Sequence, residues 1–281
     1  MRTISSDIIK NKVCELFIKS NYRIPDDIYD KIKRSAEEEK VPIAQSILNK
    51  LIENCAAAER MNIPVCQDTG MAIVFIEIGQ DVHIEGALLS DAVNAGVKEA
   101  YDKGYMRKSI VRDPLFDRTN TDDNTPAIIY TSIVPGDKVK ITAVPKGFGS
   151  ENMSAVKMFT PSATKEDVTA FVVETVRKAG GNPCPPVVVG VGIGGNFEYA
   201  PYLAKKALAR DIASSNPNAR YAALEKEMLE KINALDIGPQ GFGGDTTALA
   251  VNIEYFPTHI AGLPCAVNIG CHVTRHKEAI L

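Results

Sequence analysis

The sequence has none of the signals that mark membrane or secreted proteins. No stretch reaches the roughly eighteen consecutive apolar residues that a membrane-spanning helix needs, so no span is predicted. Residues 1–12 mix polar and apolar side chains and contain no apolar h-region of a signal peptide. We therefore expect a cytoplasmic protein that contacts no membrane.

The sequence also has no excess of positive charge. Its formal net charge is −3 at pH 7, whereas proteins that bind nucleic acids or anionic membranes usually carry a basic patch. We expect neither kind of partner. The remaining composition is ordinary: 281 residues, 45% of them apolar and 24% charged, are enough to bury a sizeable core.

The spacing of the six cysteines excludes the common clustered metal sites. Six cysteines without a secretion signal are typical of reduced thiols or metal ligands rather than of a disulfide framework. Zinc fingers and ferredoxins place their ligands in short Cys-x-x-Cys runs, which this sequence does not contain. Cys14 and Cys55 fall inside predicted helices, where we expect them to be core residues.

The apolar pattern predicts an α/β or mixed α+β fold. Residues 1–60 are expected to form three helices: one capped by Asp7, one over residues 26–40 and one beginning at Pro42. We expect this helical N-terminal layer to cover a functional site rather than to make it. Predicted strands and helices alternate after it, which indicates mixed β-sheets with flanking helices and functional loops.

One hairpin is predicted more clearly than any other pairing of strands. Residues 127–134 and 138–144 read as strands joined by Pro135-Gly136-Asp137. The second strand leads into Gly147-Phe148-Gly149, a turn whose backbone N–H groups are free to approach an anion.

A glycine run has the spacing of a dinucleotide-binding fingerprint, with Gly190, Gly192 and Gly195 in the pattern G-x-G-x-x-G. The motif expects an acidic residue at the end of a second strand about twenty residues on. Asp211 has that separation but falls in a predicted helix. We therefore rank an NAD-dependent oxidoreductase last, and interpret the glycines as letting the backbone pass close to whatever Cys184 holds.

One loop places a thiol, a carboxamide and a carboxylate on consecutive residues, Cys66, Gln67 and Asp68. Neighbouring side chains diverge on a helix or a strand. They can converge on one small object if Pro64 and Gly70 turn the backbone. The alternative is a strand-entry loop with an inert, buried cysteine.

Two later loops carry cysteines in similar surroundings. Cys184 stands between prolines in the segment 182–186, which cannot be helical. Cys271 follows Gly270 at the exit of a predicted short strand. Cys265 is a second candidate ligand in this region, and we prefer Cys271 because of its position at the strand exit.

Three thiolates are one fewer than the four that complete a [4Fe–4S] cluster. A cluster held by Cys66, Cys184 and Cys271 would leave one iron open, as a Lewis acid for a hydroxyl or carboxylate substrate. Catalytic metal sites keep such an open position, whereas structural sites do not.

A basic segment follows the helix predicted over residues 88–103. Arg107 is a candidate for binding a carboxylate on a ligand. Lys108 and Arg112 are close enough in sequence to be alternatives, and an exposed basic loop without a ligand is the simpler interpretation.

Five motifs occur together and in order over nearly the whole chain. They are Cys-Gln-Asp-Thr-Gly from Cys66, Lys-Gly-Phe-Gly-Ser-Glu-Asn from Lys146, Asn-Pro-Cys-Pro-Pro around Cys184, Gly-Phe-Gly-Gly-Asp-Thr-Thr from Gly241, and His-Ile-Ala-Gly-Leu-Pro from His259 leading to Cys271. This set resembles the alpha subunit of the iron–sulfur hydro-lyases, meaning class I fumarate hydratase and L(+)-tartrate dehydratase. One departure is Phe148, where many members carry glycine, and it bears on the details of substrate contact.

The resemblance implies one alpha-type domain over residues 1–281, a [4Fe–4S] cluster on the three loop cysteines, and reversible hydration of fumarate to L-malate, a reaction of the tricarboxylic acid cycle. It implies that Asp68 donates or accepts a proton beside Gln67. The residues implied to contact a small dicarboxylate substrate are Gln67, Asp68, Arg107, Gly149 through its backbone N–H, and His259.

The resemblance also implies a partner. In the family, further arginines, a threonine base and a lysine belong to a second domain, either fused or supplied as a beta subunit. We expect a hetero-oligomer with a separate beta subunit and little activity from this chain alone. The alternatives are the alpha subunit of L(+)-tartrate dehydratase and, more distantly, a non-catalytic iron–sulfur sensor, which would not need Gln67 and Asp68 beside its first ligand.

Overall fold

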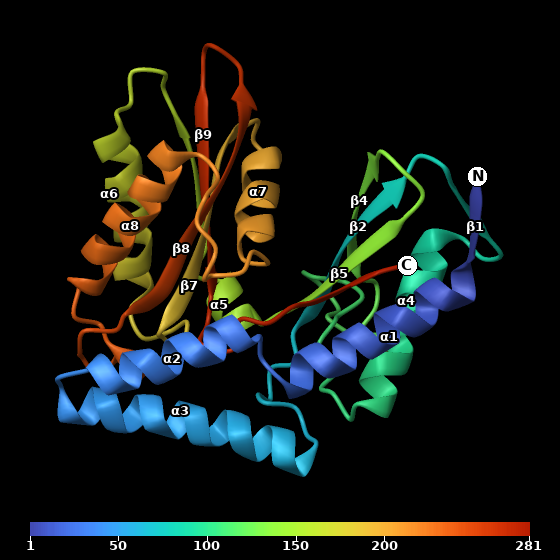
Figure 1. Ribbon diagram of the computed structural model, residues 1–281, viewed down its shortest axis with the longest axis horizontal. Helices are drawn as coiled ribbons and strands as arrows, with labels where there is room; N and C mark the ends of the chain where they lie inside the picture. Colours follow the sequence, from blue (N-terminus) through green and yellow to red (C-terminus); the bar gives the residue numbers. More distant parts are fainter. The chain divides into compact units, whose positions relative to one another are not determined.

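The computed structural model describes residues 1–281, and the chain folds into two compact units. The first unit comprises Met1–Pro25, Cys55–Phe148 and Arg275–Leu281, and the second comprises Asp26–Asn54 and Gly149–Thr274. Both units combine helices with a mixed sheet, which confirms the predicted fold class. Figure 1 labels these elements along the chain. The single domain over residues 1–281 stays a prediction.

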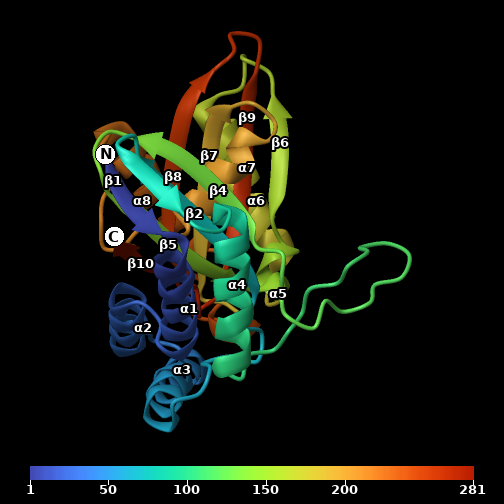
Figure 2. The ribbon, with the colours of Figure 1, turned by 90° about the vertical axis from the view of Figure 1, so that its right-hand side faces the viewer.

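The first unit is built on a four-stranded sheet with the strand order β10-β5-β2-β4. Its elements are β1 (Arg2–Ser5), α1 (Ser6–Tyr22), β2 (Met71–Gly79), β3 (Val82–Glu85), α4 (Leu89–Lys103), β4 (Ile128–Val134), β5 (Val139–Lys146) and β10 (Lys277–Ile280). α1 and α4 lie side by side (Figures 1 and 2). They pack so closely that a Cβ at Gly96 would lie 2.5 Å from the carbonyl oxygen of Lys10.

The start of α1 differs from the prediction. Ser5 is the N-cap, because its Oγ accepts a hydrogen bond from the N–H of Asp7 at 3.2 Å. The prediction that Asp7 caps the helix was wrong. Asp7 instead places a negative charge in the first turn, where it interacts favourably with the helix dipole.

The predicted hairpin is wrong, although its two strands exist as β4 and β5. β2 lies between them, with Ile73 opposite Ile128 in a parallel pair and opposite Val144 in an antiparallel pair. The N–H of Gly79 donates to the carbonyl of Lys138 at 2.8 Å and so fixes the chain that crosses the end of β2. Burial explains the order, because β2 is apolar and suits a central position, whereas β4 is largely exposed and suits an edge.

The second unit contains a sheet with the order β6-β9-β7-β8. Its elements are α2 (Asp26–Glu38), β6 (Ala155–Phe159), α6 (Lys165–Ala179), β7 (Val187–Gly195), α7 (Tyr199–Ala207), α8 (Ala219–Asn233), η1 (Pro239–Gly241), β8 (Ala248–Thr258) and β9 (Leu263–Gly270). α3 (Pro42–Met61) and the short α5 (Phe148–Glu151) each contribute residues to both units. α6 and α8 cover one face of the sheet and α7 the other (Figure 1).

The three helices predicted in residues 1–60 are present as α1, α2 and α3. α1 belongs to the first unit and α2 to the second, and α3 contributes residues to both.

The two sheets share one connectivity. In each, a central strand (β2 or β7) pairs in parallel with a later strand (β4 or β8) on one side and antiparallel with the next strand (β5 or β9) on the other. The chain passes across the end of the central strand through residues 135–138 in the first unit and 259–262 in the second.

The glycine run at Gly190–Gly195 belongs to β7 itself. It therefore forms no strand-to-helix turn of the kind that binds a dinucleotide phosphate. A Cβ at Gly192 would lie 2.0 Å from the carbonyl oxygen of Ala200, and one at Gly190 would lie 2.2 Å from that of Ala204. These glycines allow α7 to pack on the sheet, so the interpretation that they approach the object held by Cys184 was wrong.

No helix in the fold combines the length and the apolar character needed to cross a membrane.

Candidate functional site

The loop that carries Cys66 is anchored at its far end by buried polar side chains. The Tyr101 hydroxyl lies 2.7 Å from the carbonyl oxygen of Thr69 and 2.6 Å from that of Gly70. The amide of Asn124, which is fully buried, donates to the carbonyl of Gly70 at 3.2 Å. Burial raises the pKa of Tyr101, so its hydroxyl stays protonated and remains a donor. The loop is thus held from both α4 and the segment before β4.

Glycine is required at the end of this loop. Gly70 has φ +82°, and a Cβ there would lie 2.7 Å from the backbone nitrogen of Lys146. The close approach brings the Cys66 loop against the Gly147 turn, as expected from a residue that turns the chain.

The carboxylate of Asp68 has a fixed orientation. Oδ2 accepts a hydrogen bond from the N–H of Phe148 at 2.9 Å, and Oδ1 accepts one from the N–H of Gly70 at 3.1 Å. The backbone carbonyl of Asp68 accepts from the guanidinium of Arg275 at 2.5 Å. Arg275 is 2% exposed and also donates to Asn21 at 3.1 Å. Asp68 therefore faces the glycine turn with little rotational freedom.

Arg107 lies beside the same loop, because the Thr69 hydroxyl donates to its carbonyl oxygen at 2.9 Å. Its side chain is exposed and its guanidinium makes no ion pair or hydrogen bond within the fold. Lys108 is paired with Asp102, and the guanidinium of Arg112 donates to a carbonyl of its own loop at 3.4 Å. Of the three cations considered, Arg107 is the one whose charge is not engaged.

The second unit brings together the segments of Cys184 and Cys271. Cys184 has φ +54°, an uncommon backbone conformation for a residue with a side chain. Its carbonyl oxygen accepts from the backbone N–H of His272 at 3.3 Å and contacts Nδ1 of His272 at 2.9 Å. Because His272 directly follows Cys271, the two cysteine segments are joined side by side.

The glycine-rich loop that contains Gln240 is hydrogen-bonded to the segment of Cys184. The backbone N–H and the side-chain amide of Gln240 both donate to the carbonyl of Pro185, each at 2.8 Å. The loop is held in turn by Glu39, whose carboxylate accepts from the N–H groups of Asp245 at 3.1 Å and Thr246 at 3.2 Å. Burial acts to raise the pKa of Glu39, but the hydrogen bonds from Asp245, Val41 and their neighbours outweigh it and lower the pKa below its usual value.

Sequence reasoning missed these supports. Tyr101, Asn124, Gln240 and Glu39 act on partners 31 to 207 residues away. Their types and spacings carry no local signal of that role.

The remaining cysteines lie in the apolar core. Cys14, Cys55 and Cys265 are buried, which confirms the prediction for the first two. Burial raises the pKa of Cys55 to about 11 and that of Cys265 to about 12, so both remain neutral thiols near pH 7. Cys265 lies inside β9, whereas Cys66, Cys184 and Cys271 are at least partly accessible and form no disulfide.

Gly149 and His259 belong to the second unit. Gly149 lies in α5, and its N–H makes no hydrogen bond within the fold. His259 is exposed in the link after β8, and its Nδ1 accepts from the N–H of Ala261 at 3.1 Å. That link lies where β7 ends, whereas Cys184 precedes β7. The nine residues of β7 span roughly 25–30 Å at about 3.3 Å per residue, so this unit does not bring His259 to its cysteines.

The predicted site residues thus fall into two groups. The first unit holds Cys66, Gln67, Asp68 and Arg107, with Gln67 exposed. The second unit joins Cys184 and Cys271. Neither unit contains a group of three His, Cys, Asp or Glu side chains that could by themselves hold a metal ion.

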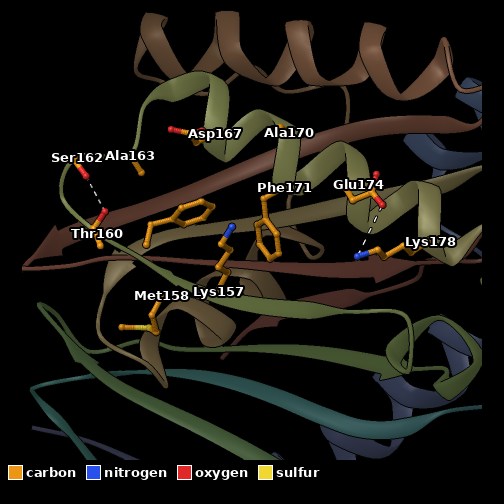
Figure 3. Close-up of a pocket in the computed structure, with 11 residues that line it drawn as sticks. Lys157, Met158, Thr160, Ser162, Ala163, Asp167, Ala170, Phe171, Glu174 and Lys178 are labelled. Atoms are coloured by element: carbon orange, nitrogen blue, oxygen red, sulfur yellow. Dashed lines mark hydrogen bonds and ion pairs between the residues drawn. The ribbon is translucent and has the colours of Figure 1, made fainter.

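A separate cavity of about 780 Å³ lies in the second unit between β6 and α6 (Figure 3). Lys157 and Phe171 project into it, and the ammonium of Lys157 lies 4.4 Å from the centre of the Phe159 ring. None of the predicted site residues lines this cavity.

Comparison with known proteins identifies the family to which the chain is similar. The family model described as fumarate hydratase (Fumerase) matches residues 10–280. A Methanocaldococcus jannaschii protein named "Putative L(+)-tartrate dehydratase subunit alpha" is 41% identical over 271 residues, covering 95% of each chain. The L(+)-tartrate dehydratase subunit alpha of Escherichia coli O157:H7 is 35% identical over 263 residues, covering 92% of this chain and 86% of its own.

The family match and the named relatives identify an enzyme subunit of the hydro-lyase class. The chain belongs to the fumarate hydratase family. This confirms the resemblance drawn from the five sequence motifs.

Proposed function

We propose that this chain is the alpha subunit of an iron–sulfur hydro-lyase that hydrates fumarate reversibly to L-malate. In this proposal Cys66, Cys184 and Cys271 hold a [4Fe–4S] cluster. The observation that carries it is the division of the six cysteines: three lie in the apolar core, and three lie in accessible loops beside polar site residues.

The donor set fits the proposed group. Iron–sulfur clusters bind through thiolates, and an apolar environment opposes the formation of a thiolate, as the raised pKa values of Cys55 and Cys265 demonstrate. The three loop cysteines lie at least partly in contact with solvent rather than in the apolar core. When bound, the cluster would supply an open iron that acts as a Lewis acid toward a substrate hydroxyl or carboxylate.

The neighbouring residues would bind the substrate and move a proton. The free guanidinium of Arg107 would bind one substrate carboxylate, with the backbone N–H of Gly149 as a further donor. The carboxylate of Asp68 is held by two N–H groups and would accept a proton on one oxygen and return it. The amide of Gln67 would orient the substrate beside it.

His259 is omitted from the site formed within one copy of the chain. It lies at the opposite end of β7 from Cys184, so a contact with substrate at the cysteines would require a second copy of the chain.

A beta subunit is part of the proposal. The described site offers one unengaged cation, Arg107, for a substrate with two carboxylates. The relatives are named as alpha subunits. We infer that the partner supplies the remaining cations, and that the hetero-oligomer works in the cytoplasm.

The second candidate is L(+)-tartrate dehydratase. Its support is specific: the relatives reported above, at 41% and 35% identity, both carry that name. The substrate differs from malate by one hydroxyl, so the same cluster and the same Asp68 chemistry would serve it.

The test is an anaerobic reconstitution of the chain with iron and sulfide, alone and with a co-expressed beta subunit. Fumarate hydration is followed by ultraviolet absorbance, and tartrate dehydration is measured beside it. Activity on fumarate that requires the beta subunit supports the first proposal. Activity on tartrate but not on fumarate supports L(+)-tartrate dehydratase instead. Absence of cluster absorbance would overturn the assignment of the three cysteines.

A further inference from the structure

The segment that follows Cys271 holds the backbone of both cysteines of the second unit. The carbonyl oxygen of Cys184 accepts a hydrogen bond from the backbone N–H of His272 at 3.3 Å and lies 2.9 Å from Nδ1 of the same residue. The carbonyl oxygen of Cys271 accepts hydrogen bonds from the backbone N–H of Thr274 at 2.9 Å and from the Thr274 hydroxyl at 2.7 Å. We call His272 and Thr274 the carbonyl clamp, because each gives two donors to one cysteine carbonyl.

The tautomer of His272 follows from this geometry. A carbonyl oxygen only accepts, so Nδ1 must carry the proton to bond Cys184. The side-chain nitrogen of Gln240 also lies 3.3 Å from Nδ1, but it can only donate, and a protonated Nδ1 cannot accept; this amide donates to the carbonyl of Pro185 at 2.8 Å. The shorter contact, to Cys184, is therefore the hydrogen bond.

The clamp is closely fitted to the chain around it. A Cβ at Gly270 would lie 2.1 Å from the hydroxyl oxygen of Thr274, so only glycine leaves room for that side chain. Cys184 has φ +54°, a conformation that needs outside support for a residue with a Cβ. Two donors on its carbonyl supply that support.

We propose that His272 and Thr274 are positioning residues that fix the directions of the Cys184 and Cys271 side chains before a cluster binds. Each Sγ is attached to Cβ, so fixing the backbone at the two carbonyls fixes the two Cα–Cβ bonds and leaves each sulfur only the few staggered positions about that bond. The proposal rests on the proposed function, in which these thiolates bind iron. Outer partners that orient ligands commonly contribute to metal affinity.

Two matched pairs of variants separate the clamp from general stability. Asn places a side-chain nitrogen where His has Nδ1, so His272→Asn keeps a donor that His272→Leu removes. Thr274→Ser keeps the hydroxyl that Thr274→Val removes while retaining its shape. Thermal unfolding of all four variants identifies any that fail to fold.

The first measurement is hydrogen–deuterium exchange on the metal-free 281-residue chain, which needs no cluster. We expect His272→Leu to speed exchange in residues 180–186 about two- to tenfold, and His272→Asn to stay near the wild-type rate. Equal exchange in the Leu, Asn and wild-type chains would overturn the clamp.

The second measurement is the loss of iron to an iron(II) chelator after anaerobic loading with ferrous iron and sulfide. We expect loss about tenfold faster or more in His272→Leu and Thr274→Val, and near wild type in His272→Asn and Thr274→Ser. Equal loss within each pair would overturn the positioning role. A wild-type chain that takes up no iron and sulfide would instead overturn the proposed function, and the exchange measurement would still test the clamp.

Discussion

At the scale of single residues, the orientation of Asp68 is the feature with the clearest chemical consequence. Both of its oxygens accept backbone N–H groups, at 2.9 and 3.1 Å. This holds the carboxylate beside Cys66 and Gln67 while leaving further lone pairs for a substrate proton.

Replacing Asp68 by Asn keeps the shape of the side chain and removes its ability to accept a proton. We expect Asp68→Asn to lower kcat of the reconstituted enzyme with its beta subunit about 100- to 10,000-fold, the usual contribution of a general acid or base. The iron and sulfide content should not change. A kcat within tenfold of wild type would contradict the proposed role.

Cys265 makes stability depend on pH. Its pKa is raised to about 12 by burial in the fold, against about 8.5 in an unfolded chain. The unfolded state therefore loses its proton first as the pH rises, so the stability contribution is full below about pH 8.5 and falls toward pH 12. The slope is about 1.4 kcal/mol per pH unit.

Urea unfolding of the metal-free chain between pH 9 and 11 tests this. The Cys265→Ala variant should lose stability with pH less steeply than wild type by about that slope. Equal slopes in the two chains would show that Cys265 does not carry the effect.

At this scale the sequence pointed to candidate site residues only where they are close together in sequence or marked by prolines and glycines. Cys66, Gln67 and Asp68 are adjacent, and prolines or glycines mark the loops of Cys184 and Cys271. The side chains that hold these loops act over long separations, as Tyr101 does on Gly70. No spacing in the sequence indicates such a contact.

At the scale of elements, a buried ion pair joins α5 to α7. Lys205 is 8% exposed and both oxygens of Glu151 face its ammonium. Burial lowers the pKa of Lys205, although Glu151 opposes that shift. Glu151 also accepts from the amide of Asn268 at 2.8 Å, so the pair ties α5 to β9. It thereby fixes the helix that contains Gly149.

Removing one member of this pair leaves an uncompensated buried charge. We expect Lys205→Met to reduce the free energy of unfolding by about 3–5 kcal/mol. The double variant with Glu151→Gln should be less destabilised than the sum of the single changes, because both charges are gone. Urea unfolding of the four chains measures the coupling, and strict additivity would rule it out.

Glycines in β7 should be far less replaceable than glycines in turns. We expect Gly192→Ala to cost about 3 kcal/mol or more, because its Cβ would lie 2.0 Å from a backbone oxygen of α7. Gly262→Ala is the control, since nothing lies within 4 Å of its added Cβ. Similar unfolding temperatures for the two variants would contradict the close packing of α7.

The sequence pattern identified helices and strands well but not the pairing of strands. The apolar periodicities located α1, α2 and α3, and strand-forming runs located β4 and β5. Pairing adjacent strands is the local choice, and it failed because β2, formed more than 50 residues earlier in the chain, takes the central position. Such an insertion depends on which strand is most fully buried.

At the scale of the whole molecule, His259 lies far from the cysteines of the second unit. Replacing it is therefore a test of whether it has any part in binding the proposed cluster. It follows β8 at the end of the sheet opposite to Cys184 and Cys271. We expect His259→Asn to leave the iron and sulfide content of the reconstituted chain unchanged, while Cys184→Ser lowers it. Loss of iron in the His259 variant would show that this histidine lies at the cluster.

The shared connectivity of the two sheets gives the chain the form of an internal duplication. Each copy has two equivalent corners, one before its central strand and one after its antiparallel neighbour. In the second copy both corners carry thiols, Cys184 and Cys271. In the first copy one corner carries Cys66, and the other carries the Gly147–Gly149 turn, which contains no cysteine. If the three loop cysteines hold a cluster as proposed, the first copy would contribute one thiolate and the second copy two, because one of the four equivalent corners carries no cysteine.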